Sequence, residues 1–202
     1  MKYLALDTCQ SNLSLVLFDG QKTYTYFDKE CGVKHSTDLM PKIEEILMQA
    51  NLGLKDLDFI GVVIGAGSFT GIRIGVSTAK ALCFASNLPC LPLSTFDTIA
   101  YNMEKGKNLA VIDAGHNGYY VAGYNDLSLE LEPCYFDKEK LSELAKEYTL
   151  LSCDEVANFN VKVTSVLDGL INYLSKNCDK AISDLDKIEP LYIRKSQAEE
   201  GR

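Results

Sequence analysis

Hydrophobic and polar positions along the chain alternate between short apolar runs and longer stretches in which apolar residues recur with helical spacing. The short runs are bounded by turn residues and predict strands at residues 3–6, 13–18, 22–27, 59–64, 90–93, 109–112 and 119–124. Helical spacing predicts helices near residues 39–50, from about 71 onward, and near 94–101, 141–148 and 163–174.

Residues 59–85 hold the most informative local pattern, in which an apolar strand leads through a glycine-rich loop into a helix. Three glycines punctuate that loop: Gly65, Gly67 and Gly71. Ser68 or Thr70 is placed to cap the helix. A strand, glycine loop and helix in this order direct backbone N–H groups at an anion or at a closely packed neighbour. The glycine spacing is not that of a dinucleotide loop, and no lysine follows the last glycine, so we do not expect a conventional nucleotide-binding loop.

Small residues recur at every fourth position of the predicted helix, so they share one of its faces. They are Gly71, Gly75, Ala79 and Cys83. Glycine inside a helix costs about 1 kcal/mol relative to alanine, so two glycines on one face require a compensating close contact. Two interpretations stay open: the face packs on the protein's own sheet, or it forms a helix–helix interface with another chain.

Composition and charge restrict the partners of the chain. It has 202 residues, of which 47% are hydrophobic and 24% are charged, as is ordinary for a globular protein. The net charge is −8, and the arginines are only Arg73, Arg194 and Arg202. Because phosphate binding needs clustered cations, we expect contact with RNA only through a partner.

The cysteines and the N-terminus indicate a cytoplasmic protein. Seven scattered cysteines without a C-x-x-C pair predict reduced thiols, with neither a disulfide framework nor a zinc site. The apolar run before Asp7 has only four residues, so we expect no signal peptide. The longest uncharged stretch, within residues 81–96, contains prolines and predicts no membrane span.

The second half of the chain repeats the opening pattern. Strand, Asp7, turn and strand at the start return as strand, Asp113, turn and strand at residues 109–124, which predicts a duplicated fold. The polar segment 105–108 marks a domain boundary. We therefore expect one domain at residues 1–105, completed by 189–202, and a smaller one at 106–188. Residues 127–187 are acidic, and apart from the two helical patterns they are irregular.

The sequence GAGSFTGIRIG at residues 65–75, with AKALCFASNLPCLPLST soon after it, resembles the signature of the TsaB (YeaZ-type) family. The family pattern reads G-P-G-S-F-T-G-L-R-I-G, so Ala66 and Ile72 are the two departures. The opening LALDT, the histidine–serine pair before the first helix and the ending IEPLYIR are also similar. The resemblance covers residues 1 to about 118 and 189–197, and it is loose between them.

The resemblance implies an α/β protein of actin-like (ASKHA or ribonuclease H-like) fold, with two lobes of mixed sheets flanked by helices and the second lobe reduced. It also implies a role in making threonylcarbamoyladenosine in transfer RNA. The chain would be a non-catalytic, scaffold-like partner that supports the catalytic TsaD subunit together with the small ATPase TsaE. ATP and magnesium would belong to those partners, and this chain alone would bind no cofactor or metal.

The docking surface for this role would come from the first two helices, which would also join two copies of the chain. Its residues would be Leu39, Ile43, Ile46, Leu47, Gly71, Arg73, Gly75, Ala79 and Cys83. The adjoining signature loop consists of Gly65, Gly67, Ser68, Phe69, Thr70 and Gly71. Arg73 has two interpretations: it holds the loop to a group within the chain, or it reaches across the interface.

A competing hypothesis is an active ATPase or small-molecule kinase of the same superfamily that uses Asp7 and Asp113. In that superfamily two such aspartates face each other across a nucleotide cleft, where carboxylates hold Mg²⁺. Alternatively, each aspartate bonds only its own turn. The turn after Thr8 lacks glycine and the second half is short, so we expect Asp7, Thr8 and Asp113 to form a degenerate cleft. A metallopeptidase has weaker support, because Leu39 stands four residues beyond His35, where a metal site would need histidine.

Overall fold

The computed structural model describes residues 1–103 and 105–194, and it divides them into two compact units. Unit 1 comprises Met1–Thr95 and Leu174–Leu191, and unit 2 comprises the described residues of Phe96–Tyr173 together with residues 192–194. The first boundary therefore lies at Thr95 rather than at Lys105. The chain returns to unit 1 at Leu174, earlier than the predicted residue 189, and residues 195–202 of that predicted segment lie outside the described residues.

Unit 1 is built on a five-stranded mixed sheet with the order β3-β2-β1-β4-β5. The strands are β1 (Tyr3–Asp7), β2 (Leu13–Phe18), β3 (Thr23–Asp28), β4 (Phe59–Val63) and β5 (Cys90–Leu93). The first three form an antiparallel meander, whereas β4 runs parallel to β1 and β5 runs parallel to β4. Strands β1 and β4 are buried along their whole length, as continuous apolar runs in a mixed sheet require.

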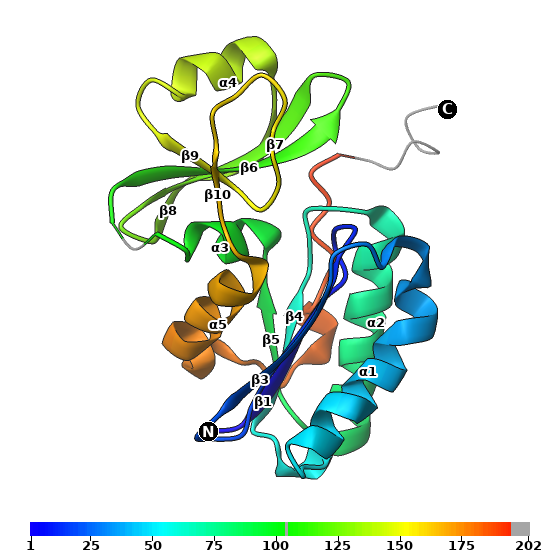
Figure 1. Cartoon of the computed structure of the whole chain (residues 1–202). Coiled ribbons are helices and arrows are strands. Elements are labelled where there is room, and N and C mark those ends of the chain that lie inside the picture. Colours follow the sequence, from blue (N-terminus) through cyan, green and yellow to red (C-terminus); the bar gives the residue numbers. More distant parts are fainter. Residues whose placement is uncertain (104, 195–202) are drawn as a thin grey trace. The chain divides into compact units, whose positions relative to one another are not determined.

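Two helices, α1 (His35–Gln49) and α2 (Phe69–Ser86), pack beside each other over one face of this sheet (Figure 1). The apolar residues that recur with helical spacing along α1 are buried, and the helix contacts β2 and β3 of the sheet. Pro41 lies inside α1 without ending it, and the helix begins after Lys34, which makes no side-chain capping hydrogen bond. Four short 3₁₀ segments complete the unit: η1 (Gly32–Lys34), η2 (Leu54–Asp56), η3 (Cys178–Lys180) and η4 (Leu185–Lys187).

Unit 2 repeats the topology of unit 1, with a five-stranded sheet of order β10-β9-β6-β7-β8. Its strands are β6 (Lys107–Gly115), β7 (Gly118–Asn125), β8 (Ser128–Asp137), β9 (Thr149–Ser152) and β10 (Lys162–Val163). An antiparallel meander is again followed by strands that run parallel to its first member. The duplication predicted from the two aspartate turns is therefore present in the strand order as well.

Helix α4 (Lys138–Leu144) contacts β7 and β8 of this second sheet, whereas α3 (Thr95–Ala100) and α5 (Val166–Asn177) each span a boundary between the two units in the sequence. Leu141 of α4 belongs to a core cluster that includes Val111 and Tyr119. On the α3 side, the Tyr124 hydroxyl donates a hydrogen bond of 2.9 Å to Asp97. The strands β8 and β9 lie in the region that was predicted to be irregular, so that prediction was wrong.

Within the described residues, none of the helices combines the length and the apolar character that crossing a membrane would require.

Candidate functional site

The first aspartate turn is closed by Asp7 itself. Its Oδ1 accepts the backbone N–H of Cys9 at 2.8 Å, and the residue is 1% exposed. Burial raises the pKa of the Asp7 carboxyl, although the hydrogen bond from Cys9 and the nearby His35 act in the opposite direction. This is the geometry of a side chain that caps its own hairpin.

The second aspartate turn has the same local geometry in unit 2. Asp113 Oδ1 accepts the N–H of Gly115 at 2.7 Å, and His116 and Asn117 follow in left-handed backbone conformations. Unlike Asp7, Asp113 is exposed. Both side chains thus cap turns, which is the simpler of the two sequence interpretations, whereas a degenerate cleft shared by Asp7, Thr8 and Asp113 stays a prediction.

The first turn does not fit a magnesium–nucleotide site. A phosphate-bound cation needs carboxylate oxygens that face solvent, but Asp7 is buried and bonded to its own backbone. Thr8 is also buried, and its hydroxyl donates to the carbonyl of Gly71 at 2.7 Å. In the described part of the chain, no group of three or more acidic, histidine or cysteine side chains could hold a metal ion.

The glycines of the signature loop make close contacts with the chain's own backbone. A side chain at Gly67 would collide with the carbonyl of Cys9, and one at Gly65 would collide with the carbonyl of Leu191. Both glycines have positive φ, at 158° and 125°. The loop is fastened to the first turn because the N–H of Ser68 donates to the Cys9 carbonyl at 2.6 Å. The signature therefore joins the start of α2 to the end of β1.

The small face of α2 packs on the same region, so its predicted role as an interface with another chain is corrected. A Cβ at Gly71 would collide with the Thr8 carbonyl, and a Cβ at Gly75 would lie 2.5 Å from Thr8 Oγ1. Ala79 and Cys83 are completely buried. Bulk is missing from this face because β1 of the same chain approaches it closely.

The apolar stripe of α1 is likewise part of the core of unit 1. Its members Leu39, Ile43, Ile46 and Leu47 are all buried, so they cannot form the docking surface to which sequence reasoning assigned them. An amphipathic helix on the surface of a protein buries its apolar stripe in the protein's own core. A partner can therefore contact only the opposite, exposed side of the helix.

Arg73 is the one predicted docking residue that is exposed. Its guanidinium carbon lies 3.9 Å from the centre of the Phe69 ring, one helical turn earlier on α2. Neither sequence interpretation of Arg73 included this stacking contact, and its role at an interface stays a prediction.

Sequence reasoning missed the outward side of the two helices, where large apolar side chains are exposed. Phe84 of α2 is 84% exposed and Met48 of α1 is 80% exposed, Met40 of α1 is also exposed, and so is Val33 on η1, just before α1. Along α2 only Arg73 and Lys80 are charged. The signal was present in the sequence, since a phenylalanine that falls outside a helix's buried face must point to solvent.

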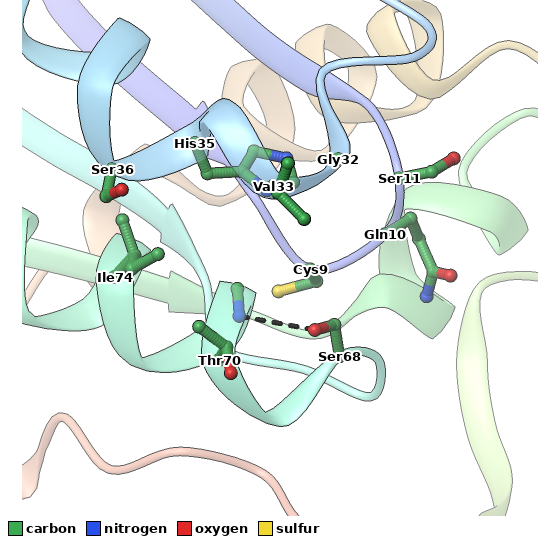
Figure 2. A pocket seen from close by; sticks show the side chains of 11 residues that line it. Cys9, Gln10, Ser11, Gly32, Val33, His35, Ser36, Ser68, Thr70 and Ile74 are labelled. Atoms are coloured by element: carbon green, nitrogen blue, oxygen red, sulfur yellow. Dashed lines mark hydrogen bonds between the residues drawn. The ribbon is translucent and has the colours of Figure 1, made fainter.

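A pocket of about 530 Å³ lies where the first turn, the start of α1 and the start of α2 meet (Figure 2). Ser68, one of the two cap residues that the sequence offered, caps α2 there by accepting the N–H of Gly71 at 3.4 Å. His35 is buried beside the pocket and joins its Nε2 to the Asn12 carbonyl at 2.9 Å. Among the described residues that line it there are hydroxyl groups and one histidine but no carboxylate, so it offers no cation site.

Comparison with known proteins identifies the family. The family model described as TsaD, tRNA N6-adenosine threonylcarbamoyltransferase, matches residues 28–164. The TsaB protein of Haemophilus influenzae, named for tRNA threonylcarbamoyladenosine biosynthesis, is 35% identical over 122 residues, which cover 58% of this chain and 51% of the relative. The TsaB protein of Escherichia coli is 31% identical over 128 residues, which cover 61% of this chain and 55% of the relative. The chain belongs to the TsaB (YeaZ-type) family.

The fold agrees with this membership. The YeaZ structure from Pseudomonas aeruginosa superimposes with a TM-score of 0.74, covering 95% of this chain and 99% of that one at 19% sequence identity. Together with the TsaD-type family match, this likeness shows an actin-like fold, as the resemblance implied. The matched sequence stretches span only about half the length of the two curated relatives.

Proposed function

We propose that this chain serves threonylcarbamoyladenosine synthesis in transfer RNA as a non-catalytic subunit that binds a TsaD-type catalytic protein and works with a TsaE-type ATPase. The observation that carries the proposal is the family match, since relatives named for this biosynthesis are 31–35% identical over more than half of the chain. The TsaD-type family model, which matches residues 28–164, supports a partner of homologous fold.

The geometry of the first turn and of the glycine loop supports a partner role over an enzymatic one. Asp7 is buried, and its carboxylate accepts a hydrogen bond from the backbone of its own turn. Two glycines of the loop lie against the backbone carbonyls of residues 8 and 9. An active ATPase or kinase would need these groups turned toward a phosphate. ATP and magnesium therefore belong to the partner proteins in this proposal, and contact with tRNA runs through them.

The docking surface in this proposal is the outward side of α1 and α2, defined by Met40, Met48, Arg73 and Phe84. Apolar side chains that are almost wholly exposed, such as Phe84 and Met48, are stabilised when a partner covers them, by about 25 cal/mol for each Å² of apolar surface removed from water. The low charge of α2 also favours an interface core, where charged residues are depleted. Buried aromatic anchors commonly carry most of the binding energy.

Binding measurements with a TsaD-type protein test this surface directly. Phe84→Glu is expected to weaken binding about tenfold or more, because it puts a charge where the partner would bury an aromatic side chain. Titration calorimetry of the wild-type chain and the variant measures the change. Leu129→Glu is the matched control, since Leu129 is an exposed apolar residue on β8 of unit 2. Equal affinity of Phe84→Glu and the wild-type chain would remove the surface from the proposal.

A further inference from the structure

A second pocket lies within unit 2, and its lining does not include the aspartate turn of that unit. Its volume is about 470 Å³, within the range of pockets that hold small molecules. Residues 148–150 and 158–162 line it, together with Ala145 after the end of α4. The pocket therefore lies between the start of β9 and the segment before β10, where these two parallel strands have not yet begun to pair.

The inner wall of this pocket is apolar and aromatic. Leu150 belongs to the core cluster of unit 2, and Tyr148, Phe159 and Val161 pack against that cluster. Both rings are half-buried, so part of each stays accessible. The Phe159 ring is held edge-on against Tyr119, with the ring centres 5.2 Å apart and an interplanar angle of 84°. Fixed aromatic rings of this kind provide a surface on which another planar ring can stack.

The polar side chains around this wall are available to a ligand, because within the described part of the chain they make no hydrogen bond or ion pair. They are Thr149, Asn158, Asn160 and Lys162. Each asparagine amide offers a donor and an acceptor side by side, which matches the polar edge of a planar heterocycle. Among the described residues that line the pocket, Lys162 is the only charged one. Lys107 adds a second cation nearby, since its Nζ lies 5.7 Å from the centre of the Tyr148 ring.

The segment that carries Asn158 is held in place by the rest of unit 2. The N–H of Phe159 donates to the Val156 carbonyl at 3.2 Å, and the Tyr119 hydroxyl donates to the Ala157 carbonyl at 3.4 Å. Asn158 has a φ of 69°, a left-handed conformation that asparagine tolerates. Because the pocket is already formed, a ligand has little chain to order when it binds.

We propose that this pocket binds a small molecule in which a planar aromatic ring carries an anionic group. The ring stacks on the aromatic wall, the asparagine amides bond its polar edge, and the ammonium group of Lys162 pairs with the anion. Nucleoside monophosphates and aromatic carboxylic acids share this chemistry. The site is separate from the docking surface on α1 and α2, and it does not depend on the proposed function.

Saturation-transfer NMR with the full chain tests the proposal. Adenosine 5′-monophosphate and indole-3-acetate each carry a planar ring and an anion, and dissociation constants of about a millimolar are expected for ligands of this size. Micromolar ATP would therefore leave the pocket almost empty. Adenosine lacks the anion and ribose 5-phosphate lacks the ring, so each is expected to bind about tenfold more weakly than adenosine 5′-monophosphate.

Two substitutions separate the contributions of the cation and of the amide. Lys162→Gln is expected to weaken both anionic probes about tenfold and to leave adenosine unchanged, since it removes only the charge. Its side chain is exposed and its backbone pairing with Leu151 is kept. Asn158→Gly suits the positive φ and is expected to weaken adenosine and its monophosphate alike.

Lys138→Gln is the matched control, because it makes the same charge change on an exposed lysine of α4 that does not line the pocket. It is expected to bind every probe as the wild type does. Thermal unfolding of each variant checks that the fold is kept. Amide chemical shifts of the wild type need no substitution, and the shifts that change with the anionic probes are expected at residues 148–150 and 158–162.

The proposal is overturned if neither anionic probe binds at concentrations up to about 10 mM. It is also overturned if ribose 5-phosphate binds as well as adenosine 5′-monophosphate, if Lys162→Gln keeps the wild-type affinity for both anionic probes, or if the shift changes lie outside the pocket. Tighter binding of adenosine 5′-monophosphate than of indole-3-acetate supports a nucleotide as the ligand, and the reverse order supports an aromatic acid.

Discussion

At the scale of single residues, the two aspartates that open the sheets show how one turn geometry can occur in two environments. Asp7 and Asp113 each accept the N–H of the residue two positions later, at 2.8 and 2.7 Å. Asp7 is buried, whereas Asp113 is exposed. Both aspartates thus make the same hydrogen bond, but only Asp7 of the two pays the free-energy penalty of removing its carboxylate from water.

Asp7→Asn is therefore expected to increase the free energy of unfolding at neutral pH, because the amide oxygen still accepts from Cys9 and no charge is buried. Burial raises the pKa of Asp7 in the folded state above that of the unfolded chain. Wild-type stability should fall relative to the variant as pH rises from the ordinary range of an aspartate through the raised pKa, and the difference should then stay constant. Urea unfolding between pH 3 and about pH 8 measures this difference.

Asp113→Asn is the matched control for that measurement. It keeps the same turn hydrogen bond but removes an exposed carboxylate, so its effect on stability should be small at every pH. If Asp7→Asn were less stable than the wild type at neutral pH, the buried carboxylate would have to make a stabilising interaction besides its hydrogen bond with the Cys9 N–H.

At the scale of elements, α2 depends on its close contact with β1. The hydroxyl of Thr8 donates to the Gly71 carbonyl, and the absence of side chains at residues 71 and 75 leaves room for this contact. A substitution that adds bulk there has to displace the helix or turn the hydroxyl away.

Gly75→Ala is expected to destabilise unit 1 by about 1–3 kcal/mol, the usual cost of overpacking a filled core. Its Cβ would lie 2.5 Å from Thr8 Oγ1 and 3.4 Å from Leu6 Cδ1. Ser77→Ala is the matched control, because Ser77 lies on the exposed side of the same helix. Thermal and urea unfolding should separate the two variants; equal stability would mean that α2 does not rest on β1 as closely as described.

This contact also explains which parts of the fold and site could be predicted from sequence. The strand, loop and helix of residues 59–85 were predictable because glycine spacing, the Ser68 cap and helical periodicity are local signals. The segment that packs on the small face of α2 could not be predicted, because Thr8 lies 63 positions before Gly71 in the sequence. Small residues allow close packing with the backbone of the same chain or of another chain, so their spacing does not distinguish the two. β8 escaped prediction because Pro133 and its register shifts break the alternation that marks a strand.

At the scale of the whole molecule, two sheets with the same strand order carry the same aspartate turn, and the buried aspartate of the first turn does not fit a magnesium–nucleotide site. The family match, the exposed helix side and the buried first aspartate together favour a subunit that acts by binding another protein.

The isolated chain is accordingly expected to give no heat of binding with Mg–ATP at micromolar concentration and no phosphate release. Titration calorimetry and a phosphate assay, run on the wild type and on Asp7→Asn, provide the measurement. Micromolar binding with turnover that disappears in Asp7→Asn would favour the ATPase or kinase hypothesis instead.

The most direct test of the central proposal is threonylcarbamoyladenosine formation on tRNA by purified TsaD-type and TsaE-type proteins, with and without this chain. Modification is expected to require the chain, to fall about tenfold or more with Phe84→Glu at limiting concentration, and to persist with Asp7→Asn. Full modification without the chain, or loss of it in Asp7→Asn with normal binding of the partner, would contradict a subunit that acts only through its docking surface.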